Sequence, residues 1–254
     1  MNSVTIIGRL TKDAVFGKTK AGTPVASFYV ASDKARRTKE ASEPNIIPVE
    51  LYGKEGIHEY LKKGTPVALY GARIQTDSYK NKEGNTVYTW TVIADRIDLL
   101  PDGKMTGSTS VDLIGRLTSD CGVSYTKGNN TCVTEFSLAV DRSRGKEKRA
   151  DFIRVKLFGK LGETLARYLV KGKLVNVKGR LDTGSYKRSD GTTVYTWDVV
   201  ADDIFLLGDG RRNASESSAP PETEAKAPVN EEVEATGFMD LPDEFDEEYF
   251  DEPF

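Results

Sequence analysis

The sequence predicts an all-β protein of two tandem five-stranded barrels, each with one short helix, followed by a disordered acidic tail. The strongest of the three observations behind this prediction is an internal repeat. Residues 4–11 (VTIIGRLT) return as residues 111–118 (VDLIGRLT), and residues 87–90 (VYTW) return as residues 194–197. A period near 107 residues is too long for a solenoid unit and suits one small domain.

The second observation is that each copy contains five β-prone runs separated by turn residues. They cover about residues 3–10, 25–33, 45–52, 66–77 and 86–94 in the first copy, and 110–117, 132–141, 151–158, 173–185 and 192–200 in the second. Between the third and fourth runs, helical spacing of apolar residues predicts a helix near residues 57–61 and another near 161–169. This order is that of the OB-fold, a barrel that binds oligonucleotides or oligosaccharides.

The third observation is a change of composition after Leu207. We expect one barrel over residues 1–100, a linker over 101–109, a second barrel over 110–207 and a disordered segment over 208–254. Residues 213–254 contain fourteen acidic side chains and one lysine, so the rest of the chain is basic although the whole carries a net charge of -3. A basic body suggests a polyanion-binding module, and an acidic tail suggests a protein contact; a solubilising tail is the alternative.

Several function classes are disfavoured. There is one His, with Cys121 and Cys132 as the only cysteines, so no four-ligand metal site can be built, and no catalytic constellation is visible. Gly8 and Gly115 stand singly and form no phosphate-binding loop. We therefore expect no enzyme activity, metal or cofactor. No apolar stretch reaches the roughly 18 residues of a membrane span and no signal peptide is evident, so a cytoplasmic, nucleoid-associated protein with reduced thiols is expected.

The third strand of the second copy carries the most informative surface. Alternation places Ile153, Val155 and Leu157 on its core face. The outer face then carries two rings and two cations, namely Phe152, Arg154, Lys156 and Phe158. Cations attract phosphates and exposed rings stack on bases at about 1–3 kcal/mol each, largely independent of base identity. Chance exposure of the rings or an oligomer contact is the alternative interpretation.

The same strand of the first copy is less suited to this role. Its core face is Ile47, Val49 and Leu51, and its outer face is Ile46, Pro48, Glu50 and Tyr52. Pro48 also interrupts the ladder, which is usual only at sheet edges or bulges. We therefore expect the second copy to bind nucleic acid more tightly.

Loops add further candidates. Tyr79 and Tyr186 stand beside cations in the hairpins after the fourth strands. Trp90 and Trp197, in the fifth strands, could be base-stacking rings, core residues or subunit contacts, whereas Phe28 and Phe136 are expected in the cores. The cations expected to contact phosphates are Arg154, Lys156, Lys160, Lys187, Arg188, Arg142 and Arg144 in the second copy, and Arg36, Arg37, Lys54, Lys80 and Lys82 in the first.

These residues, in this order, resemble the bacterial single-stranded DNA-binding protein family. The opening run 4–13, the strands at 26–28 and 134–136, the corner 157–161 and the segment 168–180 all match family landmarks. The resemblance implies stacking rings at Phe152, Phe158 and Tyr186, and at Tyr52 and Tyr79 in the first copy. It also implies a homodimer, because family members with two OB-folds per chain assemble four barrels from two chains.

The tail resembles the family as well. Such proteins close on an acidic run, an apolar residue and Pro-Phe, which dock on replication, recombination and repair enzymes. Here the last residues are Asp251, Glu252, Pro253 and Phe254, with Glu252 in place of the apolar one. The expected function is sequence-tolerant binding and protection of single-stranded DNA, with recruitment of partner enzymes through the tail. An RNA-binding OB module and a nuclease are the alternatives.

Overall fold

The computed structural model describes residues 1–34, 43–54, 56–57, 59–80, 84, 86–103, 106–142, 149–187 and 193–208. In the first copy these residues form β1 (Asn2–Leu10), β2 (Val15–Lys18), β3 (Pro24–Ser32), β4 (Asn45–Tyr52), β5 (Pro66–Lys80), β6 (Thr86–Ala94) and β7 (Ile97–Leu99). In the second they form β8 (Ser108–Leu117), β9 (Gly122–Tyr125), β10 (Cys132–Arg142), β11 (Arg149–Phe158), α1 (Lys160–Ala166), β12 (Leu174–Lys187) and β13 (Thr193–Leu206).

The predicted fold class is confirmed, and each of the ten predicted strands is present. Three short strands were not predicted: β2, β7 and β9. All four residues of β2 and of β9 are exposed, and these strands form the two ends of the sheet path. A strand with no buried face has no alternation of apolar and polar residues, so the period-2 signal is absent there.

Each copy closes into a barrel because its first strand pairs with two neighbours. β1 pairs with β3 and β5, and β8 pairs with β10 and β12. Gly8 lies at this crossing: a Cβ there would be 2.1 Å from the Ala31 carbonyl oxygen, and one at Gly115 would be 2.7 Å from that of Ala139. The repeated glycine therefore allows close strand contact. Phe28 and Phe136 are buried in the cores, as expected.

The predicted helix forms in the second copy only. Residues 160–168 separate Gly159 from the buried Leu169, whereas only residues 54–60 separate Gly53 from the equally buried Leu61. With two residues fewer, and with Gly56 at φ 84°, outside the right-handed helical region, the described residues of the first copy make turns there. The prediction of a helix near residues 57–61 is wrong for this part of the chain. No helix among the described residues is long and apolar enough to cross a membrane.

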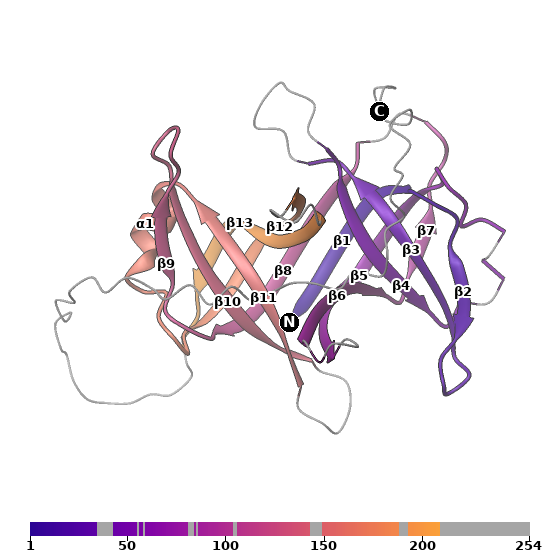
Figure 1. The fold of residues 1–254 in the computed structure, drawn as a ribbon, viewed down its shortest axis with the longest axis horizontal. Coiled ribbons are helices and arrows are strands. Elements are labelled where there is room, and N and C mark those ends of the chain that lie inside the picture. The colour runs from indigo at the N-terminus through magenta and orange to yellow at the C-terminus, as the bar shows by residue number, and fades with distance from the viewer. Residues whose placement is uncertain are drawn as a thin grey trace.

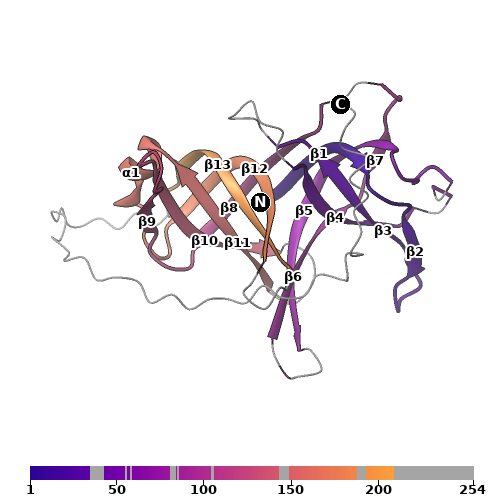
Figure 2. The ribbon, with the colours of Figure 1, turned by 45° about the horizontal axis from the view of Figure 1, so that its top comes forward.

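The two barrels lie side by side and share one continuous sheet (Figures 1 and 2). β1 pairs antiparallel with β8, from Asn2 opposite Leu113 to Ile7 opposite Ser108. Within this ladder Val4 lies opposite Val111, which is its own counterpart in the repeat. A pseudo-two-fold axis therefore passes between Val4 and Val111, and the chain pairs its two copies as a symmetric dimer pairs its subunits.

Candidate nucleic-acid interface

The outer face of β11 has the predicted arrangement of rings. Ile153, Val155 and Leu157 are buried, while Phe152 is 61% exposed and Phe158 is half-buried on the opposite face. β13 pairs with β11 on one side and with β12 on the other. The exposed Tyr186 lies near the end of β12, in the β12–β13 hairpin. The strand arrangement therefore places this ring two strands away from the β11 face.

The two cations of this face are already paired. Lys156 Nζ lies 2.8 Å from Asp198 Oδ2 and 3.6 Å from Glu135 Oε1. Arg154 Nε lies 3.1 Å from Asp198 Oδ1, and its Nη2 donates to the Trp197 carbonyl oxygen at 3.2 Å. Burial lowers the pKa of the Lys156 ammonium, but the hydrogen bond to Asp198 and the charge of that carboxylate outweigh it and raise the pKa overall. Arg154 and Lys156 are therefore not two free cations, because Asp198 and Glu135 balance their charge.

The matching face of the first copy is neither cationic nor fully open. Ile47, Val49 and Leu51 are buried, as predicted. The Tyr52 hydroxyl donates to Glu50 Oε2 at 2.5 Å; burial first and this carboxylate second raise the pKa of Tyr52 to about 12. Pro48 is buried, and β4 runs between β3 and β6 rather than along a sheet edge. Pro48 precedes the first β4–β6 pair, Val49 opposite Val92.

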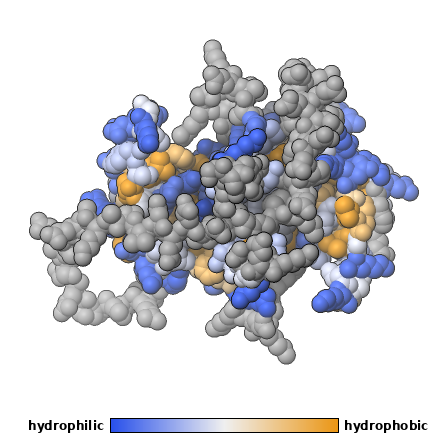
Figure 3. All heavy atoms as spheres, viewed as in Figure 1, coloured by the Kyte–Doolittle hydropathy of each residue, from blue (hydrophilic) through white to orange (hydrophobic). Residues whose placement is uncertain are grey.

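Other predicted residues fall into two groups. Tyr79, Lys54, Lys80, Lys160 and Lys187 are exposed. Figure 3 shows that hydrophobic residues on the face in view form separate patches between hydrophilic residues. The remaining predictions lie outside the described residues: Arg36, Arg37, Lys82, Arg144, Arg188, Asp251, Glu252, Pro253 and Phe254.

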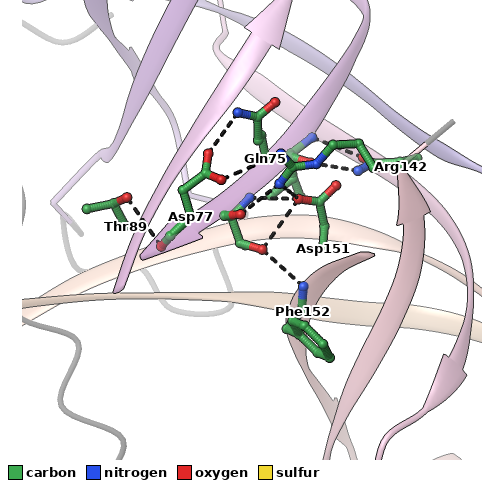
Figure 4. Close-up of polar contacts among 9 residues, drawn as sticks. Gln75, Asp77, Thr89, Arg142, Asp151 and Phe152 are labelled. Carbon is green, nitrogen blue, oxygen red and sulfur yellow. Dashed lines mark hydrogen bonds and ion pairs between the residues drawn. The ribbon is translucent and has the colours of Figure 1, made fainter. Parts of the chain in front are cut away.

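Arg142 does not belong to an open basic face. Its Nη2 lies 2.6 Å from Oδ1 of the fully buried Asp151 and donates to the Thr76 carbonyl oxygen at 2.7 Å, while Nη1 lies 3.5 Å from Asp77 Oδ1. Figure 4 shows this guanidinium between Asp77, on β5 of the first copy, and Asp151, on β11 of the second. Arg142 therefore links the two barrels and has little exposed side chain left for the phosphate contact expected of it.

The same network reaches the first ring of the β11 face. Thr76 N donates to Asp151 Oδ1 at 2.8 Å, and Phe152 N donates to Thr76 Oγ1 at 3.0 Å. The symmetry-related contact on the other side of the pseudo-two-fold axis uses a neutral side chain in place of Asp151. There, Thr183 N donates to Asn45 Oδ1 at 2.8 Å. Asn45 is the repeat counterpart of Asp151, and Thr183 is that of Thr76.

Trp90 and Trp197 meet at this boundary. Their rings stack with centroids 4.5 Å apart and an interplanar angle of 17°. Thr76 lies opposite Trp90 and Thr183 opposite Trp197 in their ladders. One face of each indole is therefore covered by the other ring, and only the opposite face could stack on a base. The structure favours a contact between the copies.

Sequence reasoning missed Asp198, Asn45 and Asp151. The last two carried a usable signal, since each is a polar residue that continues the core alternation of its strand, ahead of Ile47 and Ile153 respectively. A polar residue at a core position indicates a specific partner. Asp198 had no comparable signal, because its cation partners lie more than 40 residues away in sequence.

Comparisons with known proteins agree with this architecture. The model of the single-strand binding protein family matches residues 1–100 and again residues 108–207. The single-stranded DNA-binding protein of Clostridium tetani is 47% identical over 109 residues, covering 42% of this chain and 75% of that protein. Single-stranded DNA-binding protein 3 of Clostridium acetobutylicum is 46% identical over 105 residues, covering 41% and 73%.

A solved structure extends the likeness over both copies. The wild-type single-stranded DNA binding protein from Thermus aquaticus matches with a TM-score of 0.65 at 25% identity, over 85% of this chain and 97% of that one. The two family matches fall on the two barrels and together span most of the 254 residues. The chain therefore belongs to the single-strand binding protein family.

Proposed function

We propose that this protein binds single-stranded DNA with little regard to sequence, without catalysing a reaction, and that its second copy provides the stronger contact. The observation that carries the proposal is the outer face of β11, where Phe152 and Phe158 stand on an OB-fold barrel next to β13 and its hairpin with β12. An exposed phenyl ring costs hydration free energy, which stacking on a base recovers. The relatives' names, single-stranded DNA-binding protein, support DNA as the ligand.

Fluorescence tests the proposal directly. Trp and Tyr emission of the full chain is titrated with oligo-dT, the matched duplex and the matched RNA at several salt concentrations. We expect single-stranded DNA to bind more tightly than duplex and RNA, with affinity falling as salt rises because phosphate contacts release counterions. Equal affinity for duplex would contradict the proposal, and a clear RNA preference would favour the RNA-binding alternative.

We also propose that the protein protects DNA during replication, recombination and repair, and that its acidic segment recruits enzymes. Fourteen acidic residues and four phenylalanines in residues 213–254 support docking on a basic, partly apolar pocket. Deleting residues 251–254 should leave DNA affinity equal or slightly higher, because an anionic segment competes with DNA for the basic body. It should abolish capture of a repair helicase; unchanged capture would exclude this docking role.

A homodimer with four barrels is the proposed assembly. The outer side of the shared sheet supports it: Ile7 on β1 and Ile114 on β8 are repeat counterparts on this side, with the exposed Tyr70 on β5 and Phe205 on β13 flanking them. This face is centred on the pseudo-two-fold axis between β1 and β8 and carries these four apolar side chains, so it can pair with an identical face about a further two-fold axis.

A further inference from the structure

Asp198 lies in an unusual position for a carboxylate. It precedes Val199, which fills the core, and alternation therefore puts its side chain on the outer side of β13, next to the cations of β11. Only 7% of the residue is exposed. Burying a carboxylate is costly unless cations pair with it. Here two cations do so: Arg154 at 3.1 Å and Lys156 at 2.8 Å.

The barrel itself does not require this carboxylate. The repeat counterpart of Asp198 in the first copy is Thr91, and that barrel closes with the same strand pairing. The cations are absent there too, since Pro48 and Glu50 occupy the positions of Arg154 and Lys156. The carboxylate therefore accompanies the two cations as a set, in the copy that retains both phenyl rings.

The contacts of Asp198 are ionic and incompletely hydrogen-bonded. Within the described residues, its Oδ1 is buried and has no hydrogen-bond donor with acceptable geometry, although Arg154 Nε lies close. Arg154 keeps half of its side chain exposed, and Lys156 keeps about a third. A phosphate can therefore approach both cations from solvent while the carboxylate stays beneath them.

We propose that Asp198 is an internal counterion of the β11 face: it occupies Arg154 and Lys156 in the free protein and, resting on the proposed binding of single-stranded DNA, yields part of that pairing to a phosphate in the complex. Because the carboxylate already neutralises much of their charge, these cations neutralise little of a phosphate's charge and release few of the salt cations condensed on the DNA. Binding at this face then depends mainly on the rings and responds weakly to salt. Asp198 thus acts as a positioning residue that sets the salt dependence of binding.

The test measures how log K for oligo-dT depends on log salt for the full chain and for D198N. Removing the carboxylate exposes one net positive charge, so the slope should become steeper by about 0.7, the value for one further phosphate on a single strand. Between 50 and 200 mM salt, D198N should therefore lose roughly threefold more affinity than the wild type loses. A purely structural role would change the free energy of unfolding but not this slope.

D202N is the matched control. Asp202 lies on the same strand, is exposed and pairs with Arg180, so its substitution removes one charge away from the β11 face and should leave the slope unchanged. E135Q is the second variant, because the exposed Glu135 side chain lies 3.6 Å from Lys156 Nζ, and we expect an exposed substitution of this kind to leave the barrel folded. Its slope should steepen by less than that of D198N.

The outcomes separate the two proposals. If D198N is folded and its slope is unchanged or shallower than that of the wild type, the counterion role is excluded while DNA binding stands. If D198N fails to fold, E135Q provides the test instead, and an unchanged salt slope for E135Q excludes the counterion role. If D202N steepens the slope as much as D198N, total charge rather than this site sets the dependence. Failure of the wild type to prefer single-stranded DNA would reject the function itself.

Discussion

At the scale of single residues, the two copies differ most at one equivalent ring. Phe158 and Tyr52 occupy the same repeat position at the end of β11 and β4. Tyr52 is hydrogen-bonded to Glu50, so a carboxylate lies next to its ring. The counterpart of Glu50 is Lys156, which carries the opposite charge. A DNA backbone passing over both barrels therefore meets repulsion near Tyr52 that is absent near Phe158.

Ring substitutions test this difference. F158A should weaken binding to oligo-dT by about 1–3 kcal/mol, or roughly 5- to 150-fold in Kd, because one stacking contact is lost. Y52A should cost clearly less, since the ring it removes is paired with Glu50. Fluorescence titration at fixed salt measures both, with Y168A as the control for an exposed tyrosine outside these strands. Equal losses for F158A and Y52A would contradict the inequality of the copies.

At the scale of elements, the starts of β4 and β11 join the barrels in two ways. Asn45 accepts from Thr183 N as a neutral amide, whereas Asp151 accepts from Thr76 N as a carboxylate that also pairs with Arg142. Removing one partner of a buried ion pair leaves the other charge uncompensated. The second contact is therefore the more vulnerable of the two, and it is also the one that fixes the backbone of Phe152.

D151A should lower the free energy of unfolding by about 3–5 kcal/mol, because Arg142 loses its buried partner and Thr76 N loses its acceptor. D151N should cost less, since an amide oxygen can still accept from Thr76 N, as Asn45 does from Thr183 N. Urea denaturation followed by circular dichroism measures both. If D151A and D151N are equally stable, or if D151A matches the wild type, the ion pair does not stabilise the junction.

The elements also show how far the sequence leads. Strands with one buried face, such as β4 and β11, were predictable because their core residues alternate with outer ones. The exposed strand β2 was not predictable in this way. The helix expected in the first copy does not form because that segment is two residues shorter, and this effect becomes clear only once the fold is known. At the site, alternation predicted the direction of Phe152 and Phe158. It could not predict that Arg142 contacts Asp77 or that Lys156 contacts Asp198, because these carboxylates lie on strands brought close only by tertiary pairing.

At the scale of the whole molecule, the pseudo-two-fold axis gives one chain the symmetry of a dimer. The outer side of its shared sheet carries Tyr70 and Phe205, which are 43% and 51% exposed. Lys178 lies over the Phe205 ring, with its Nζ 5.8 Å from the ring centroid, so a cation stands beside this aromatic side chain. Stacking two such faces about a further two-fold axis would bury all four aromatic rings and produce a closed assembly of four barrels.

Native mass spectrometry tests this assembly. The wild-type protein should have twice the 28.0 kDa mass of one chain without DNA, and that mass plus the mass of the bound oligonucleotide with oligo-dT. Y70E/F205E should yield a folded monomer, because four buried carboxylates without partners would oppose pairing of the faces. Y60E/Y168E alters two other exposed tyrosines and should remain dimeric. A monomeric wild type would reject the dimer, and a Y70E/F205E variant that stays dimeric would place the contact on a different surface.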